Sequence, residues 1–147
     1  MTRHEETRVM PYTPVQMLEM IADIEKYPEF LPWCKGARIR NRQSKGDLEI
    51  VEADLIIAFL AFREKFGSNV TIDQSSQTID VQYLDGPFYN LTNYWKFKPH
   101  DNGCEVNFFV EFEFKSRVLE AVIGKVFDQA MRKIIHAFEV RAKELYG

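Results

Sequence analysis

Apolar and polar side chains alternate through the middle of the sequence, and this period of two is typical of β-strands with one buried face. The alternation is clearest in residues 104–115, where valines and phenylalanines share one side and glutamates occupy most of the other. Similar segments precede it at residues 36–43, 48–57, 61–73, 78–84 and 90–98. Turn-forming residues separate these segments about every ten residues, which predicts six consecutive antiparallel strands.

The N-terminal region predicts one more strand and two short helices. Residues 4–10 form a short strand, and Thr13 with Gln16 then provides a capping box for a helix. Pro28 stops this helix, because proline disfavours a helical conformation in the residue before it. Pro32 keeps a second helical turn short.

The C-terminal region predicts one long helix. Residues 116–146 carry apolar side chains at the i, i+4, i+7 spacing of an amphipathic helix. Thirty helical residues would extend about 45 Å, which is longer than a small sheet needs, so we expect a break near Gly124.

Together these elements predict one α+β domain spanning residues 1–147. The sheet of about seven antiparallel strands has one apolar face that another layer must cover, and only the C-terminal helix is long enough to do so. A strongly curved sheet around a single helix leaves space between them, because a helix cannot fill the concave side of a bent sheet. We therefore expect an internal cavity.

Composition adds an aromatic bias and excludes several classes of protein. Aromatic residues make up 14% of the 147 residues, and the net charge of −3 gives no general footprint for DNA or other nucleic acid. Cys34 and Cys104 are far apart and have no nearby ligand pair, so we expect reduced thiols and no metal site. The N-terminus lacks a secretory signal, and the longest apolar run, residues 55–62, is far below the roughly 20 residues that span a bilayer. These features predict a cytoplasmic protein, at most peripheral to a membrane.

Four segments of the sequence resemble a known family. They are YPEFLPWC (27–34), FREKFGSNV (62–70), LDGPFYNLTNYWKF (84–97) and the C-terminal helix with the strand end before it. Their order resembles the helix-grip fold of the START-like lipid-transfer superfamily. More specifically, they resemble the coenzyme Q-binding, polyketide cyclase-like family, whose bacterial members include ribosome-association toxins.

The resemblance implies a ubiquinone-like isoprenoid quinone as the bound ligand, with no other cofactor, and a quinone chaperone or carrier role in respiration. The alternative it implies is a toxin-like protein that binds the large ribosomal subunit and blocks subunit association. A polyketide cyclase-like enzyme is the third possibility.

The predicted cavity wall combines the connection after the first helix, the apolar strand faces and the C-terminal helix. Segment 27–34 places rings where a polar loop is usual; they either line the cavity or plug the end of a solid core. The wall residues are Tyr27, Phe30, Leu31, Trp33, Phe62, Phe66, Tyr83, Leu91, Asn93, Trp95, Phe108, Val110, Phe112, Phe127, Met131, Ile134 and Phe138.

Three polar residues are candidates for contacts with a quinone head group: Glu64, Ser68 and Asn93. An unpaired buried carboxylate is costly, so the alternative for Glu64 is a solvated pair with Arg63 at the rim. The alternative for Asn93 is a satisfied polar group in the core.

The apolar segment 58–62 is expected at a hairpin tip, where it either folds over the cavity as a lid or touches a membrane during lipid exchange. Catalysis is not expected. None of His4, His100 and His136 is predicted to project into the cavity beside a carboxylate, and no catalytic motif is present. The ribosome alternative depends on basic residues of the last helix, which a solvated helix face explains equally well: Lys125, Arg132, Lys133, Arg141 and Lys143.

Overall fold

The computed structural model describes residues 2–147 and contains seven strands, two α-helices and one 3₁₀ helix. In chain order they are β1 (Thr2–Met10), α1 (Pro14–Ala22), the 3₁₀ helix η1 (Ile24–Glu29), β2 (Cys34–Lys45), β3 (Leu48–Phe59), β4 (Phe62–Asp73), β5 (Thr78–Asp85), β6 (Phe88–His100), β7 (Gly103–Phe114) and α2 (Arg117–Tyr146).

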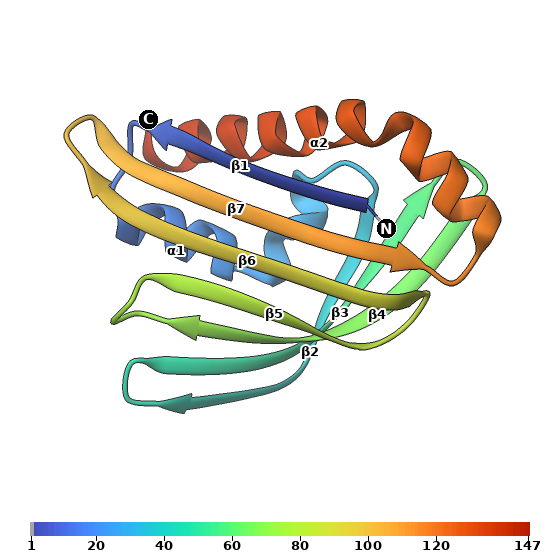
Figure 1. The fold of residues 1–147 in the computed structure, drawn as a ribbon. Helices are drawn as coiled ribbons and strands as arrows, with labels where there is room; N and C mark the ends of the chain where they lie inside the picture. Colours follow the sequence, from blue (N-terminus) through green and yellow to red (C-terminus); the bar gives the residue numbers. More distant parts are fainter. Residues whose placement is uncertain (1) are drawn as a thin grey trace.

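The strands form one antiparallel sheet in the order β1-β7-β6-β5-β4-β3-β2. Strands β2 to β7 follow one another as the predicted meander, and β1 pairs with β7 at the edge (Figure 1). Register shifts interrupt the pairing of β2, β4 and β6, and such bulges increase the local bend and twist of a sheet. The alternation in the sequence therefore predicted the strands and the consecutive order of β2 to β7, but not the position of β1.

Helix α1 begins with the predicted capping box. The Gln16 backbone N–H donates to Thr13 Oγ1 at 3.1 Å, and the Thr13 backbone N–H donates to Gln16 Oε1 at 3.0 Å. These two bonds satisfy backbone donors that the first helical turn would otherwise leave free. The second short helix is η1, which contains Pro28.

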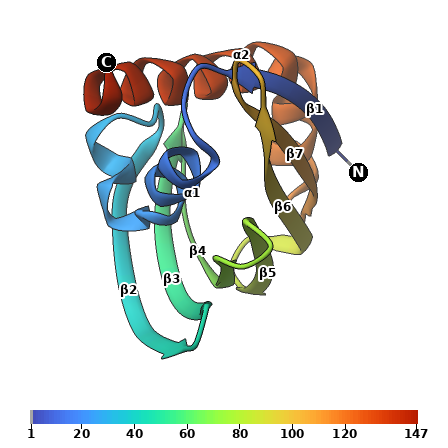
Figure 2. The same cartoon turned by 90° about the vertical axis from the view of Figure 1, so that its left-hand side faces the viewer.

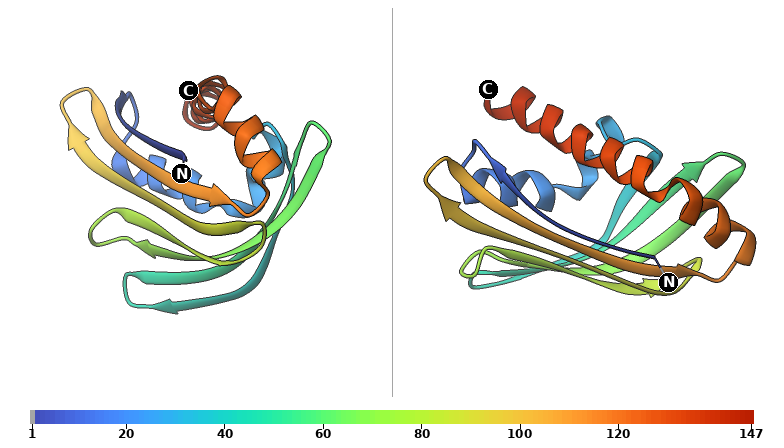
Figure 3. Two further views of the ribbon diagram at one scale, coloured as in Figure 1. Left: turned by 45° about the vertical axis from the view of Figure 1, so that its right-hand side comes forward. Right: turned by 45° about the horizontal axis from the view of Figure 1, so that its top comes forward.

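Helix α2 is continuous over 30 residues, so the predicted break near Gly124 is wrong. Ser116 caps its start by accepting a hydrogen bond from the Leu119 backbone N–H at 3.1 Å. Instead of breaking, the helix bends, so that its first part runs in a different direction from the rest (Figure 3, left). A bend lets a long helix follow a curved sheet without losing its hydrogen bonds.

The sheet is curved into a trough, and α2 lies across its open side (Figure 2). Helix α1 lies inside one end of the trough (Figure 2). It belongs to the core cluster that contains the largest fully buried side chains: Leu18, Ile21, Val51, Ile72, Ile79, Phe97 and Cys104. This core is packed apart from a void of about 50 Å³ beside Met17 and Ile21. No helix within residues 2–147 is both long and apolar enough to cross a membrane.

Candidate functional site

A cavity of about 330 Å³ lies between the concave face of the sheet, the connection before β2, and α2. Its volume is at the lower end of the range for small-molecule sites, about 300–1,000 Å³. The cavity is partly open to solvent and has no charged side chain among its lining residues. It begins where the core around α1 ends and extends toward the tip of the β3–β4 hairpin.

The strands contribute inward-facing residues at every second position. On β3 these are Leu55, Ile57 and Phe59, and the longest such series is on β7. Helix α2 contributes one stripe, with residues spaced three or four apart. The β7 and α2 residues in the wall are Val110, Phe108, Phe112, Phe114, Ile123, Phe127, Ala130, Met131, Ile134 and Phe138.

The aromatic connection before β2 forms one side of this wall. The Tyr27 hydroxyl donates a hydrogen bond to the Ile21 carbonyl, and burial raises the pKa of Tyr27 above its ordinary value. Its ring contacts Phe138 of α2 edge-on at 5.9 Å between centroids. Trp33 has a positive φ of 65° and its ring contacts Phe59 edge-on at 5.2 Å. Tyr27 and Trp33 therefore line the hollow.

Most of the residues predicted for the wall line the cavity. These are Tyr27, Leu31, Trp33, Phe66, Leu91, Asn93, Trp95, Phe108, Val110, Phe112, Phe127, Met131, Ile134 and Phe138, together with the polar candidate Ser68. Their contact with a ligand stays a prediction.

Phe30, Phe62, Tyr83 and Glu64 are not part of the lining. Phe30 lies in an outer layer, against Phe138 at 5.5 Å between ring centroids. Tyr83 lies behind Phe88: its hydroxyl accepts a hydrogen bond from the Phe88 backbone N–H at 3.0 Å. Phe62 and Glu64 have the parity of the wall residues but belong to the outer end of the β3–β4 hairpin.

The wall also contains residues that sequence reasoning missed: Ile21, Ile24, Pro32, Cys34, Leu55, Ile57, Phe59, Val70, Ile79, Val81, Phe88, Phe114, Ile123 and Ala130. Several had a usable signal. Val81 and Ile79 share the inward parity of Tyr83, and Phe114 shares that of Phe112. The uninterrupted apolar run of β3 hides which of its residues point inward.

Three polar side chains interrupt the apolar wall. Asn93 Nδ2 donates to the Phe109 carbonyl at 2.9 Å, and Trp95 Nε1 donates to Asn93 Oδ1 at 3.0 Å. Ser68 is only 4% exposed. Cys34 is a free, buried cysteine, and burial raises the pKa of its thiol, so this side chain is neutral at pH 7.

A charged cluster on the outer face of the sheet lies at the register shift between Gly67 and Ser68 of β4. The guanidinium of Arg40 on β2 is hydrogen-bonded to Asp54 on β3 and, at 3.1 Å, to Asp85 on β5. It lies directly over Gly67, where an added Cβ would be 2.6 Å from the Arg40 Nη2 atom. Hydrogen bonds from Arg40 hold the pKa of Asp54 below its ordinary value.

The histidines lie outside the cavity lining. His4 Nε2 is 3.0 Å from Glu6 Oε1, so this histidine has a carboxylate beside it, but the pair lies outside the cavity lining. The pair lies at the seam between β1 and α2, where Arg8, Asp128 and Arg132 are close by.

Residues 10–139 match a family model described as polyketide cyclase / dehydrase and lipid transport. Ribosome association toxin RatA of Rickettsia prowazekii (strain Madrid E) is 38% identical over 148 residues, which cover 99% of this chain and 99% of that protein. A mitochondrial coenzyme Q-binding protein homolog B of Xenopus laevis is 30% identical over 149 residues, covering 98% of this chain and 59% of that protein.

A START superfamily protein from Mycobacterium smegmatis has the same fold. The two structures have a TM-score of 0.80 at 18% sequence identity, and the match covers 97% of this chain and 98% of the other. This likeness confirms the helix-grip fold.

Proposed function

The chain belongs to the polyketide cyclase / dehydrase and lipid transport family, and on this premise we propose that it binds an isoprenoid lipid, with ubiquinone as the ligand, inside the cavity. The observation that carries this proposal is a hollow with an almost entirely apolar wall and no charged residue in its lining. Such a wall suits a hydrocarbon chain, which needs dry surface and few directional contacts.

The size of the cavity sets how much of the ligand it holds. Each buried CH₂ contributes about 0.8 kcal/mol, so one isoprene unit of five carbons contributes at most roughly 4 kcal/mol. A volume of about 330 Å³ takes a ring and a short length of chain, and a longer tail leaves through the open side. This arrangement fits a carrier that shields part of a membrane lipid and supports respiration.

Direct analysis of the purified protein tests the proposal. Native mass spectrometry with lipid extraction should find a quinone bound to protein from a ubiquinone-producing host. Trp33→Glu should empty the cavity, because it places a charge in the apolar wall. Tyr89→Glu is the matched control, since Tyr89 is 64% exposed and outside the lining. A wild-type protein that carries no quinone and takes up no short-chain ubiquinone would contradict the proposal.

Ribosome association is the second candidate, and the named relatives favour it over the quinone carrier. The RatA relative matches over almost its full length, whereas the coenzyme Q-binding relative matches over 59% of its length. We propose the large ribosomal subunit as the partner in this case. Bound lipid and ribosome association are compatible, because the cavity is internal and ribosome contact uses the surface.

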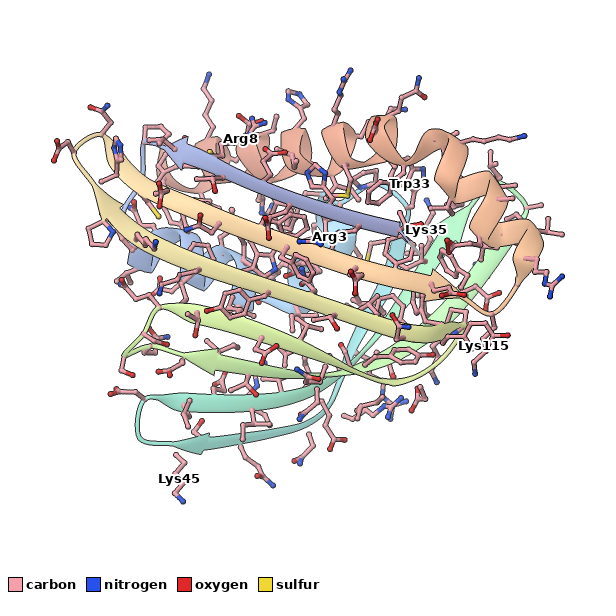
Figure 4. All side chains as sticks on the ribbon, in the orientation of Figure 1. Arg3, Arg8, Trp33, Lys35, Lys45 and Lys115 are labelled. Carbon is pink, nitrogen blue, oxygen red and sulfur yellow. The ribbon has the colours of Figure 1, made fainter. Side chains whose placement is uncertain are left out.

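The surface gives this second candidate limited support. Arg141 is paired with Glu29 at 3.0 Å and its guanidinium lies over the Phe30 ring, so it is committed within the protein. Lys125, Arg132 and Lys143 are exposed. Other basic residues are dispersed: Arg3, Arg8, Lys35, Lys45 and Lys115 are spread across the view of the molecule in Figure 4.

Cosedimentation with ribosomal subunits tests this candidate. Contacts to RNA phosphates should weaken steeply between about 50 and 200 mM salt. Reversing the charge of Arg132 should weaken binding further, while Lys45→Glu at the distant β2–β3 turn should not. Absence of cosedimentation at low salt would rule out the ribosome as a direct partner.

We also propose that the protein binds its ligand without transforming it, working in the cytoplasm and peripherally at the inner membrane. Supporting this, the lining contains no Asp, Glu, Lys, Arg or His, and burial raises the pKa of its two titratable residues, Tyr27 and Cys34, which keeps both neutral. Recovering a bound quinone unchanged in mass after prolonged incubation is the expected result. A new product would identify an enzyme.

A further inference from the structure

Ser68 stands out among the polar side chains of the wall. It is 4% exposed, lines the cavity, and its hydroxyl has no hydrogen-bond partner within residues 2–147. Every fully enclosed polar side-chain atom in the same residues does have a partner, so this hydroxyl must open into the hollow. A hydroxyl that faces an apolar hollow has no protein partner there, so a polar atom of a ligand could form a hydrogen bond with it.

Asn93 offers a second donor. Trp95 Nε1 can only donate and the Phe109 carbonyl can only accept, so their bonds to Asn93 fix which way the amide points. One of the two Nδ2 hydrogens is thereby used on Phe109. The other is left for a ligand in the cavity that Asn93 lines.

The register of the sheet sets the distance between these two donors. Ser68 on β4 pairs with Tyr83 of β5, and Asn93 on β6 pairs with Val81 of the same strand. Two strand spacings and a two-residue offset place the two Cα atoms about 12 Å apart. The inward curve of the sheet brings side chains on its concave face closer together than their Cα atoms. Val81 lies between them and also lines the cavity.

This spacing matches the two ends of a para-quinone ring. The carbonyl oxygens of such a ring point in opposite directions and are about 5 Å apart, and a hydrogen bond of about 2.9 Å at each end gives a donor-to-donor span of about 11 Å. One ring lying over Val81 can therefore accept a hydrogen bond from each donor.

We infer that the cavity binds a quinone with its ring inward, held between the Ser68 hydroxyl and the Asn93 amide, and with its isoprenoid tail leaving past Trp33 and Phe59. This inference rests on the proposed lipid-binding function. The direction follows from the fold, because the core around α1 leaves a void of only about 50 Å³ at that end, whereas the hollow of about 330 Å³ extends toward the β3–β4 tip, where Leu60 is 77% exposed.

The two tryptophans of the chain report the position of the ring. Quinone rings quench tryptophan fluorescence at short range. Trp95 is hydrogen-bonded to Asn93, whereas Trp33 lies beside Phe59 at the exit. Trp33→Phe leaves only Trp95, and saturating short-chain ubiquinone should quench most of its emission. An isoprenoid hydrocarbon of the same tail length, which lacks the ring, should quench none of it. Quinone bound in the Trp33→Phe variant without quenching Trp95 would overturn the ring-inward orientation.

Ser68→Ala tests the hydrogen bond with almost no change in shape. It should weaken binding of short-chain ubiquinone about five- to tenfold, the value of one buried hydrogen bond, and leave binding of the ringless hydrocarbon unchanged. Ser44→Ala, at an exposed position outside the cavity, is the matched control.

The outcomes separate the two proposals. If the wild type binds ubiquinone and Ser68→Ala binds it equally well, the contact assigned to Ser68 is wrong and lipid binding stands. If the wild type binds neither ubiquinone nor the hydrocarbon, the proposed function itself is wrong.

Discussion

Enlarging Ala130 tests whether the space between α2 and the sheet is vacant. Ala130 is a half-buried residue of α2 that lines the cavity. Replacing it with leucine adds three carbons, which contribute at most about 2.4 kcal/mol at about 0.8 kcal/mol each. Because the site is half-buried, we expect about 1–2 kcal/mol of stabilisation. Leucine and alanine have similar helix propensities, so α2 itself should change little.

Calorimetry of lipid-free protein provides the measurement. For a domain of this size, 1 kcal/mol corresponds to roughly 3 °C in Tm, so Ala130→Leu should raise Tm by about 3–6 °C. The same variant should bind ubiquinone less tightly, since leucine occupies space that the ligand needs. Ala121→Leu, at an exposed position of the same helix, should change stability by less than about 0.5 kcal/mol.

The sign of the change decides between a hollow and a solid interior. An added side chain in a fully packed core forces strain and typically costs about 1–3 kcal/mol. A lower Tm for Ala130→Leu, with Ala121→Leu unchanged, would therefore refute the vacancy of the cavity.

Three further predictions concern the Arg40–Asp54–Asp85 cluster, the Cys34 thiol and the tip of the β3–β4 hairpin. Arg40 lowers the pKa of Asp54 in the folded state, so this carboxylate stabilises the fold above its ordinary pKa of 3.8 and loses its effect as pH falls through the lowered value. In urea unfolding, the free energy of unfolding of Asp54→Asn should therefore fall less on acidification than that of the wild type. Burial raises the pKa of the Cys34 thiol, so Cys34 should react slowly with iodoacetamide, and more slowly still when quinone is bound. Cys104 is the control: its pKa is raised to about 11 and it lies outside the lining, so its reaction rate should not change when quinone is added. Leu60→Ser should slow quinone transfer to lipid vesicles several-fold while leaving affinity unchanged, and equal transfer rates would exclude membrane contact by this tip.

Much of this architecture follows from local sequence signals. A period of two predicted the strands, and the capping box at Thr13 predicted where α1 begins. The wall residues of β7 were predictable because Glu105, Glu111 and Glu113 mark the opposite face. The break expected near Gly124 failed because a bend accommodates the length of α2 without ending the helix.

Other features depend on the three-dimensional arrangement and have no local signal. Arg40, Asp54 and Asp85 meet across three strands, and nothing in their spacing predicts a shared contact. The sequence likewise could not show that Phe62 and Glu64 stay outside the lining while their β3 partners Phe59 and Ile57 belong to it, because parity fixes a face and not which side chains reach the cavity. The inward position of Phe88 depends on the turn before β6, whose geometry the sequence left undefined.

Methyl NMR spectroscopy of the protein with short-chain ubiquinone tests the central claim most directly. The account predicts intermolecular contacts between the quinone ring and the Val81 methyl groups, and between the tail and methyl groups of Ile57 and Ile123, all in the cavity wall. Ile50, which is 37% exposed and outside the lining, should show none. Contacts confined to surface methyl groups, or none at saturating quinone, would contradict it.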